Sequence, residues 1–365
     1  MKNHLYLRLI VCLFLLPATS SAAEKMLYFP PATGAWEQVD PAQLGWNVDR
    51  LKDAINYAGE QKSSGVVILY RGRILLEKYW PLDPPAKDAN GRPNRYFHMR
   101  VGKNAQGRAI EDVASAQKSV AAMLVGIAQH KGLLKIEDPV HKHLGTGWSK
   151  APAKAEAKIT IRHLITMTSG LTTGLEYEVP AGKKWMYNTN AYSRSLMCVA
   201  KASKMKPNEL TSKWLTAPTG MQDSRWAPRP WISMRADANS VGFATTARDL
   251  ARFGLLMLAN GHWDGQDVIE DKAYIKAATS PSQQLNGSYG YLWWLNVNRS
   301  KTAGNNRGGR MTFAAPADMY AAKGALVRRL YVLPTQQVVI TRLGAQPAKD
   351  FDSQFFRRLK QAIGK

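Results

Sequence analysis

The strongest constraint on the fold is that apolar, β-branched segments occur in pairs at both ends of the chain. Near the amino end, residues 66–70 and 74–80 flank the sequence Arg71-Gly72-Arg73, a combination typical of a hairpin. Near the carboxyl end, residues 329–333 and 338–343 flank a second turn. Because an isolated strand pair is only marginally stable, we expect both pairs to join in one antiparallel sheet.

Helical patterns accompany the predicted strands. Residues 47–60 and 350–363 predict a helix near each end, and the middle of the chain is mostly helical, with examples at 119–129 and 246–259. The sequence therefore predicts an α+β fold. Its antiparallel sheet comes from the N- and C-terminal segments, is flanked by helices and carries an inserted helical lobe at roughly 120–245. A mature chain of about 340 residues is long for one simple core, so we expect two lobes with a cleft between them.

The first 23 residues have the pattern of a secretory signal peptide. Lys2 and Arg8 precede the apolar run 9–16, and small residues follow at 20–23. The apolar run is shorter than the roughly 18 residues that a membrane-spanning helix needs. We expect cleavage near Glu24, a periplasmic or secreted product without a transmembrane segment, and a single folded domain over 24–365.

The charge of the chain bears on its partners. Lys and Arg number 50 against 27 Asp and Glu, a formal net charge of +23. Such a surface attracts anions, so we expect association with an anionic cell envelope. The basic residues are dispersed and accompany no nucleic-acid-reading motif, so we expect no nucleic-acid partner.

Cysteine and histidine usage indicates neither a disulfide nor a metal site. After removal of the signal segment, Cys198 is the only cysteine, and its apolar neighbours predict a buried, unreactive thiol. His141 and His143 flank Lys142, but no second cluster completes a set of metal ligands. We expect a solvated helix end there, and no metal or organic cofactor.

Ser115 and Lys118 form the most informative local pattern for function. They lie three residues apart where the apolar run 119–129 begins, and helical positions i and i+3 share a face. A serine becomes nucleophilic when a neighbouring base takes its proton, and burial lowers a lysine pKa by up to roughly 3–5 units, which makes lysine such a base. The same spacing also occurs by chance at ordinary helix starts. The surrounding sequence must therefore decide whether Ser115 and Lys118 are a catalytic pair.

Four further segments resemble sequence landmarks of a known superfamily. They lie at 132–140, 159–171, 246–254 and 289–294. Together with Ser115-Ala116-Gln117-Lys118, they occur in the order in which the serine β-lactamase and penicillin-binding-protein superfamily has its landmarks, and the chain especially resembles the branch of class C β-lactamases and related esterases and amide hydrolases. The resemblance covers most of the mature chain. It implies a β-lactamase/transpeptidase-like fold and an acyl intermediate on Ser115.

The superfamily's second catalytic motif is a Tyr-x-Asn sequence on a loop beside the serine. The resemblance assigns Tyr187 to the tyrosine, as a general acid/base. Thr189 occupies the place of the asparagine. The asparagine role therefore falls either to Asn190, one residue later, or to Asn188.

The third motif, a Lys-Thr-Gly-like triplet on the strand that borders the cleft, has two candidates. We prefer Ala322-Lys323-Gly324 to Lys301-Thr302-Ala303-Gly304, which has one residue too many and runs into a glycine-rich loop. In the preferred assignment, Gly324 lets substrate approach the backbone. The amides of Ala325 and Ser115 then form an oxyanion hole.

Ala322 departs from the family pattern by replacing a polar or charged residue that would bind a substrate carboxylate. Lys323, Arg328 or Arg329 could supply the missing charge, but strand alternation leaves open which side chains face the cleft. This departure argues against efficient β-lactam hydrolysis.

Together, these features imply an exported serine hydrolase that cleaves an ester or amide of a small-molecule or peptide acyl substrate through acyl-Ser115. Lys118 and Tyr187 act as its general acid/base groups. One alternative is a β-lactamase or D-alanyl carboxypeptidase acting on β-lactams or cell-wall peptides. Another is a non-catalytic penicillin-binding or scaffolding protein of the same fold.

Overall fold

A computed structural model describes residues 26–83, 85–87, 90–229, 232, 240–297 and 309–363. The predicted signal segment and the alternative triplet at 301–304 lie outside the described residues. Within the described part of the chain, no helix combines the length and apolar character needed to cross a membrane.

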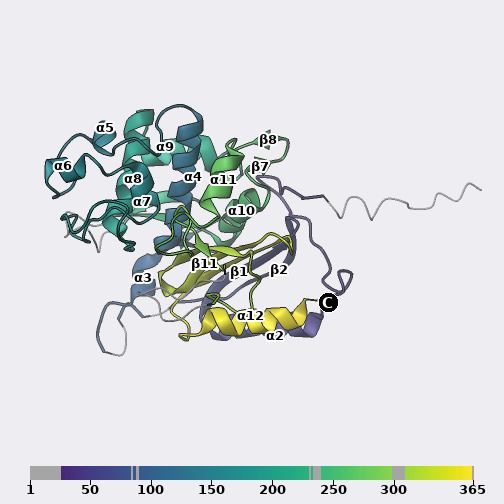
Figure 1. Ribbon diagram of the computed structural model, residues 1–365. Helices are drawn as coiled ribbons and strands as arrows, with labels where there is room; N and C mark the ends of the chain where they lie inside the picture. Colours follow the sequence, from purple (N-terminus) through teal and green to yellow (C-terminus); the bar gives the residue numbers. More distant parts are fainter. Residues whose placement is uncertain are drawn as a thin grey trace, which may run out of the picture.

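The two ends of the chain form one antiparallel sheet at the centre of the molecule, as predicted (Figure 1). Its strand order is β2-β1-β12-β11-β10-β9, so the amino-terminal hairpin pairs directly with the last strand. The turn of that hairpin requires the left-handed backbone region, with φ of 48° at Arg71 and 84° at Gly72. The strands are β1 (Ser63–Tyr70), β2 (Arg73–Tyr79), β9 (Trp294–Leu295), β10 (Tyr320–Gly324), β11 (Arg328–Leu333) and β12 (Val338–Gly344).

Two terminal helices cover one face of this sheet. They are α2 (Val48–Glu60) and α12 (Phe351–Ala362), which lie side by side beneath the strands in Figure 1. The Asn47 side chain accepts a hydrogen bond from the Arg50 amide at 3.0 Å and so caps α2 at its predicted start. Apolar side chains from both helices and from alternate strand positions form a core layer between the helices and the sheet.

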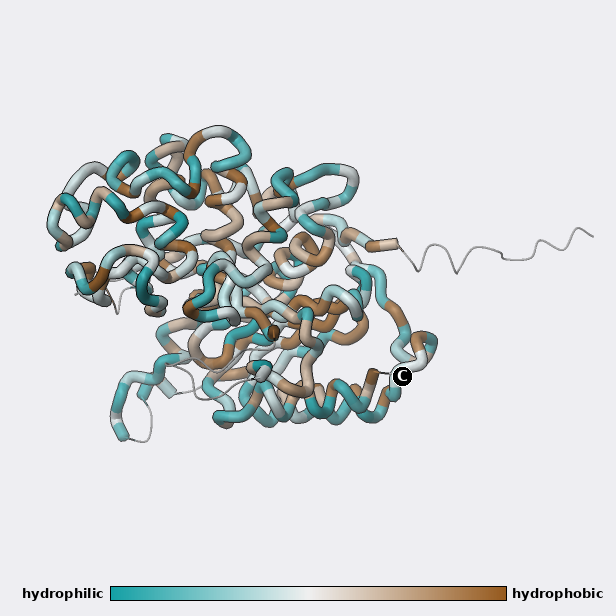
Figure 2. The backbone as a smooth tube through the Cα atoms, in the orientation of Figure 1, coloured by the Kyte–Doolittle hydropathy of each residue, from teal (hydrophilic) through white to brown (hydrophobic). Residues whose placement is uncertain are grey.

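The opposite face carries α10 (Ala247–Leu258) and the helical lobe. Gly254 allows α10 to lie close to the sheet, since a Cβ there would come within 2.5 Å of Leu330 and Val339. The larger core lies between this face and the lobe, where the tube of Figure 2 is mostly apolar. The remaining helices are α3 (Arg95–Met99), α4 (Gln117–His130), α5 (His141–Leu144), α6 (Ala153–Glu156), α7 (Ile161–Ile165), α8 (Thr189–Ser203), α9 (Pro207–Thr211) and α11 (Lys272–Ala278), with a π turn at Ser212–Thr216.

A second, smaller antiparallel sheet was not predicted. Its order is β3-β4-β6-β5, and β5 and β6 lie within the 120–245 region that the sequence indicated to be helical. These strands are short, and the pairing of β4 with β6 joins segments far apart in the chain, so no local pattern marks them. The small sheet comprises β3 (Arg100–Lys103), β4 (Ala109–Asp112), β5 (Arg225–Pro228) and β6 (Val241–Thr245), and a separate hairpin pairs β7 (His262–Trp263) with β8 (Gln266–Asp267).

Candidate active site

Ser115 lies in a 3₁₀ turn, Ala114–Ala116, that joins β4 to α4. The turn begins with Ala114 in the left-handed region at φ 51°, a conformation that needs support in a residue other than glycine. Asp112 provides it, because its Oδ1 accepts a hydrogen bond from the Ala114 amide at 2.8 Å. The nucleophile candidate therefore sits on a sharp, side-chain-braced turn at the start of a buried helix.

Arg229 holds Asp112 in place. Its guanidinium donates to both carboxylate oxygens of Asp112, at 2.6 and 2.8 Å. The same guanidinium donates to Oε1 of Gln117 at 2.9 Å. Gln117 in turn accepts from the Phe243 amide at 3.0 Å and donates to the Tyr192 hydroxyl. This buried network fixes both ends of the Ser115 turn.

Lys118 lies next to Ser115, as the spacing predicted. Its Nζ is 3.0 Å from Ser115 Oγ, and the side chain is buried on the first turn of α4. Desolvation, with a smaller contribution from the charge of Arg229, lowers the pKa of Lys118 to about 7. The ammonium nitrogen lies 4.8 and 4.3 Å from the ring centres of Tyr187 and Tyr192. A large share of the Lys118 side chains is therefore neutral near pH 7, as a base for Ser115 must be.

Tyr187 joins this pair from the loop that precedes α8. Burial raises the pKa of its hydroxyl to about 12, and a hydrogen bond with Ser115 opposes that shift. The rings of Trp185, Tyr289 and Trp294 surround Tyr187, with centroids 5.9 to 6.4 Å away. The phenol is consequently protonated at neutral pH and held in contact with the serine.

The two asparagines after Tyr187 have different positions. Asn188 is the buried N-cap of α8: its Oδ1 accepts from the Asn190 and Ala191 amides, and its Nδ2 donates to the carbonyls of Leu171 and Thr172. Asn190 is partly exposed and donates from Nδ2 to the Thr173 carbonyl at 2.7 Å. Asn188 thus serves the local fold, and the substrate-binding role of Asn190 stays a prediction.

Strand β10 packs directly against the Ser115 turn at Gly324. A Cβ at this position would lie 2.1 Å from the Val113 carbonyl oxygen and 3.2 Å from the Ala116 amide nitrogen. This corrects the reason given for the glycine, because its missing side chain makes room for the nucleophile turn rather than for substrate. Ala325 follows at the first position of the 3₁₀ turn Ala325–Val327.

The predicted role of Lys323 in substrate binding is wrong. Lys323 and Ala321 point to the face covered by α12, where Lys323 Nζ lies 3.1 Å from Asp352, whereas Ala322 belongs to the core on the Ser115 side. Alternation along β10 therefore places alanine, and no cation, on the side of the cleft.

The two arginines that the sequence offered as substitutes are also engaged elsewhere. Arg329 pairs with Asp352 and donates to the Gly324 carbonyl at 2.8 Å. Arg328 is fully buried and pairs with Glu111 at 2.8 Å. Neither therefore supplies the missing charge in the cleft.

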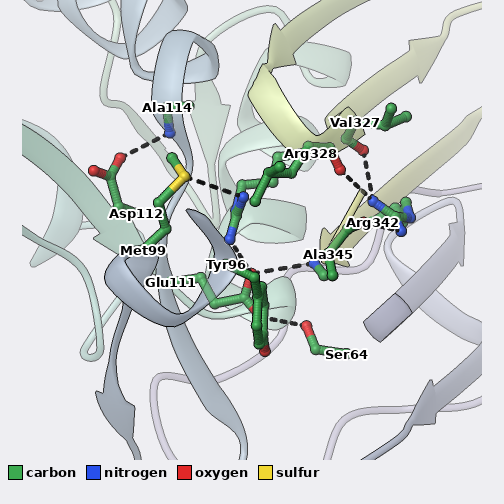
Figure 3. Close-up of polar contacts among 12 residues, drawn as sticks. Ser64, Tyr96, Met99, Glu111, Asp112, Ala114, Val327, Arg328, Arg342 and Ala345 are labelled. Carbon is green, nitrogen blue, oxygen red and sulfur yellow. Dashed lines mark hydrogen bonds and ion pairs between the residues drawn. The ribbon is translucent and has the colours of Figure 1, made fainter. Parts of the chain in front are cut away.

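Sequence reasoning missed the polar cluster beneath this site. Figure 3 shows the Glu111 carboxylate between Ser64, Tyr96 and Arg328, and all four side chains are buried. Arg342 lies beside them and donates to the Leu326 and Val327 carbonyls at 2.7 and 3.1 Å. Leu326 and Val327 have φ of 57° and 58°, so Arg342 braces the left-handed turn that follows Ala325.

The remaining predictions concern cysteine and metal. Cys198 is buried in α8, and desolvation raises the pKa of its thiol to about 12, which agrees with a structural role. His141 and His143 lie on the short helix α5, where His143 hydrogen-bonds Asp138. Among the described residues, no three His, Cys, Asp or Glu side chains are grouped as metal ligands.

Comparison with known proteins identifies the family. The Beta-lactamase family model matches residues 48–362. An uncharacterized protein, BpOF4_21049 of Alkalihalophilus pseudofirmus, is 24% identical over 276 residues, which are 68% of this chain and 74% of that protein.

Similar solved structures share the fold. The D-alanine carboxypeptidase AmpC from Burkholderia cenocepacia superimposes with a TM-score of 0.59 at 17% identity, over 86% of this chain and 99% of that one. A β-lactamase from Mycobacterium bovis, Mb2281c, also gives a TM-score of 0.59, at 15% identity over 85% and 97% of the two chains. With the family match spanning nearly the whole described chain, the protein belongs to the beta-lactamase family and has the β-lactamase/transpeptidase fold.

Proposed function

We propose that this protein is an exported serine hydrolase that cleaves an ester or amide bond through an acyl-Ser115 intermediate. The observation that carries the proposal is the 3.0 Å contact between Ser115 Oγ and Lys118 Nζ, together with a Lys118 pKa of about 7. A buried, partly neutral lysine beside a serine hydroxyl has little structural use but is suited to general-base catalysis.

Acylation begins when neutral Lys118 accepts the Ser115 proton as Oγ attacks the substrate carbonyl. Tyr187 stays protonated because its pKa is about 12, so it acts as the proton donor and relay. It passes its proton to the leaving group and regains one from the Lys118 ammonium. Water then attacks the acyl carbonyl, with the same groups taking and returning the proton.

The oxyanion of each tetrahedral intermediate is bound by the amides of Ser115 and Ala325. The close packing of Gly324 on Val113 and Ala116 supports this pairing, because it fixes the end of β10 against the serine turn. Hydrogen-bond donors that are already fixed toward the developing negative charge stabilise the transition state more than donors that must first reorganise.

The substrate class follows from the residues that border the cleft. Ala322 is apolar, and Lys323, Arg328 and Arg329 are committed to carboxylates elsewhere. Substrates that need a cation for a carboxylate next to the scissile bond, such as β-lactams and D-alanyl peptides, are therefore second candidates. What supports these second candidates is that a protein of the same fold, from Burkholderia cenocepacia, is named a D-alanine carboxypeptidase. Small neutral esters and amides come first.

Export and envelope association are part of the same proposal. The amino-terminal pattern supports secretion, and the net charge of +23 supports residence near anionic lipids or polymers of the envelope. Raising the salt concentration should release the protein from anionic envelope fractions, because salt screens such attraction.

The test is hydrolysis of p-nitrophenyl butyrate by the mature protein beside Ser115→Ala and Lys118→Ala. Matched controls are Ser353→Ala on the exposed side of α12 and Lys131→Ala just after α4. We expect both active-site variants to lose at least 99% of the activity and both controls to keep it. A chromogenic cephalosporin, assayed in parallel, should be turned over far more slowly than the ester.

Other outcomes are informative. Equal activity in the parent protein and Ser115→Ala would overturn the catalytic assignment. A Ser115 adduct with penicillin that never turns over, without esterase activity, would favour the non-catalytic penicillin-binding alternative.

A further inference from the structure

A groove along α8 adjoins the candidate active site and shares Gln117 and Tyr192 with the network around Ser115. It has a volume of about 650 Å³ and runs between α8, the start of α9 and the strands β5 and β6. Ligand sites in proteins are typically clefts of this size. Much of its lining is apolar, with the side chains of Leu196, Met197, Met205, Trp226 and Val241.

The groove keeps large apolar side chains in contact with solvent. Met197 is 44% exposed and Val241 is 37% exposed, so two of the few large hydrophobic side chains that the described surface exposes belong to this one groove. Scattered exposed hydrophobics are ordinary, but a pair gathered in one concave site indicates a binding surface.

One face of α8 forms the long wall. Ser193, Met197, Ala200 and Lys204 follow one another at three- and four-residue steps, and Lys201 lies four residues after Met197, so these residues line a continuous stripe. From Tyr192 to Lys204 this wall is about 18 Å long at 1.5 Å per residue. The shape suits an extended chain better than a compact ring.

Cationic side chains line the groove unequally along the wall. Lys201, Lys204 and Lys206 gather at the far end, whereas Arg194 is the one cation among the described lining residues near Tyr192. Among the described residues that line the groove, none is an aspartate or a glutamate. A ligand with an apolar chain and one anionic end would therefore place its charge at the lysines.

The near end of the groove adjoins the candidate active site. Gln117 and Tyr192 line it there, and the centre of the Tyr192 ring lies 4.3 Å from Lys118 Nζ. Gln117 and Tyr192 are hydrogen-bonded to each other, so the groove and the candidate active site share these two side chains.

We propose that this groove binds a single-chain anionic amphiphile, a fatty-acyl chain that ends in a carboxylate. The chain lies along α8 over Leu196, Met197 and Val241, and the carboxylate is held by Lys201 and Lys204. Binding at this site does not depend on the proposed hydrolase activity.

The test is isothermal titration of the mature Ser115→Ala protein with dodecanoate, below the concentration at which dodecanoate forms micelles. Ser115→Ala removes turnover, so a failure of the hydrolase proposal leaves this measurement intact. We expect one saturable site, with dodecyltrimethylammonium, the cationic amphiphile of equal chain length, binding at least tenfold more weakly.

Paired variants locate the site. In the Ser115→Ala background, Met197→Glu should weaken dodecanoate binding at least tenfold, whereas Leu285→Glu, at an equally exposed hydrophobic residue elsewhere, should not. Lys201→Glu with Lys204→Glu should weaken it similarly, whereas the exposed pair Lys154→Glu and Lys158→Glu should leave it unchanged.

Three results would overturn the proposal. They are the absence of saturable dodecanoate binding, equal affinity for the cationic amphiphile, and equal binding by the groove variants and their controls. Binding of phosphatidylglycerol vesicles that Met197→Glu abolishes, without binding of dodecanoate, would assign the groove to a membrane surface instead.

Discussion

Gly324 lies so close to Val113 that a Cβ on the glycine would stand 2.1 Å from the Val113 carbonyl oxygen. This contact joins the last residue of β10 to the residue before the Ser115 turn, although the two are far apart in the sequence. The strand end and the nucleophile turn are thereby held as one rigid unit. The positions of the Ser115 and Ala325 amides depend on that unit.

Replacing Gly324 should therefore impair catalysis. In Gly324→Ala the new methyl group must push β10 away from the turn, and we expect kcat/KM for p-nitrophenyl butyrate to fall on the order of 100- to 1000-fold, as for loss of an oxyanion donor. Gly287→Ala is the matched control, because a Cβ at Gly287 would have no atom within 4 Å. Parental activity in folded Gly324→Ala would contradict this account of the site.

The acylation rate should depend on the ionisation of Lys118. Because the pKa of Lys118 is about 7 and only the neutral amine accepts the Ser115 proton, kcat/KM should rise tenfold per pH unit below about 7 and level off above it. Stopped-flow ester hydrolysis from pH 5 to 9, corrected for background, measures this profile. A flat profile, or a midpoint above pH 9, would exclude Lys118 as the base. Lys131→Ala should reproduce the parental curve.

Buried Lys118 should also lower the free energy of unfolding of the protein. Burial lowers the pKa of Lys118 from 10.5 to about 7, so between these values the unfolded chain binds the extra proton and unfolding is favoured. The pKa difference corresponds to at most about 5 kcal/mol. Because Lys118→Met also loses the Ser115 contact, we expect it to raise the free energy of unfolding by about 2–4 kcal/mol below pH 7. The gain should shrink as pH rises toward 10.5. Urea unfolding of both proteins at pH 6 and pH 9 checks the sign, and an equal difference at both pH values would contradict the ionisation argument.

The parts of the site that the sequence predicted are those fixed by local geometry or by a motif. Ser115 and Lys118 share a helix face because of their three-residue spacing, and Tyr187 was identified from its motif. The central sheet and its terminal helices were predicted because their apolar runs are long and periodic. The short strands of the second sheet lack such a signal.

Long-range contacts explain what the sequence could not predict. The face that Lys323 occupies could not be predicted, because a strand pattern gives alternation but not which face receives which residue. Arg229 braces Asp112 across 117 positions, and Arg328 meets Glu111 across 217. Each partner alone resembles an ordinary charged residue, so only the folded structure reveals these pairs.

The pair of Glu111 and Arg328 leads to a final prediction. Both side chains are fully buried, and Glu111 also accepts hydrogen bonds from Tyr96, Ser64 and the Gly344 amide. Glu111→Gln leaves the Arg328 guanidinium buried without a countercharge, so we expect the free energy of unfolding to fall by about 3–5 kcal/mol.

Equilibrium urea unfolding measures that change. Glu137→Gln is the matched control, because Glu137 pairs with Arg162 on the surface and its loss should change stability by less than about 1 kcal/mol. Adding Arg328→Met to Glu111→Gln removes the stranded charge and should restore part of the lost stability, which separates an electrostatic effect from damaged packing. A single variant as stable as the parent, or a double variant less stable than Glu111→Gln, would show that the buried charge pair does not hold this part of the site together.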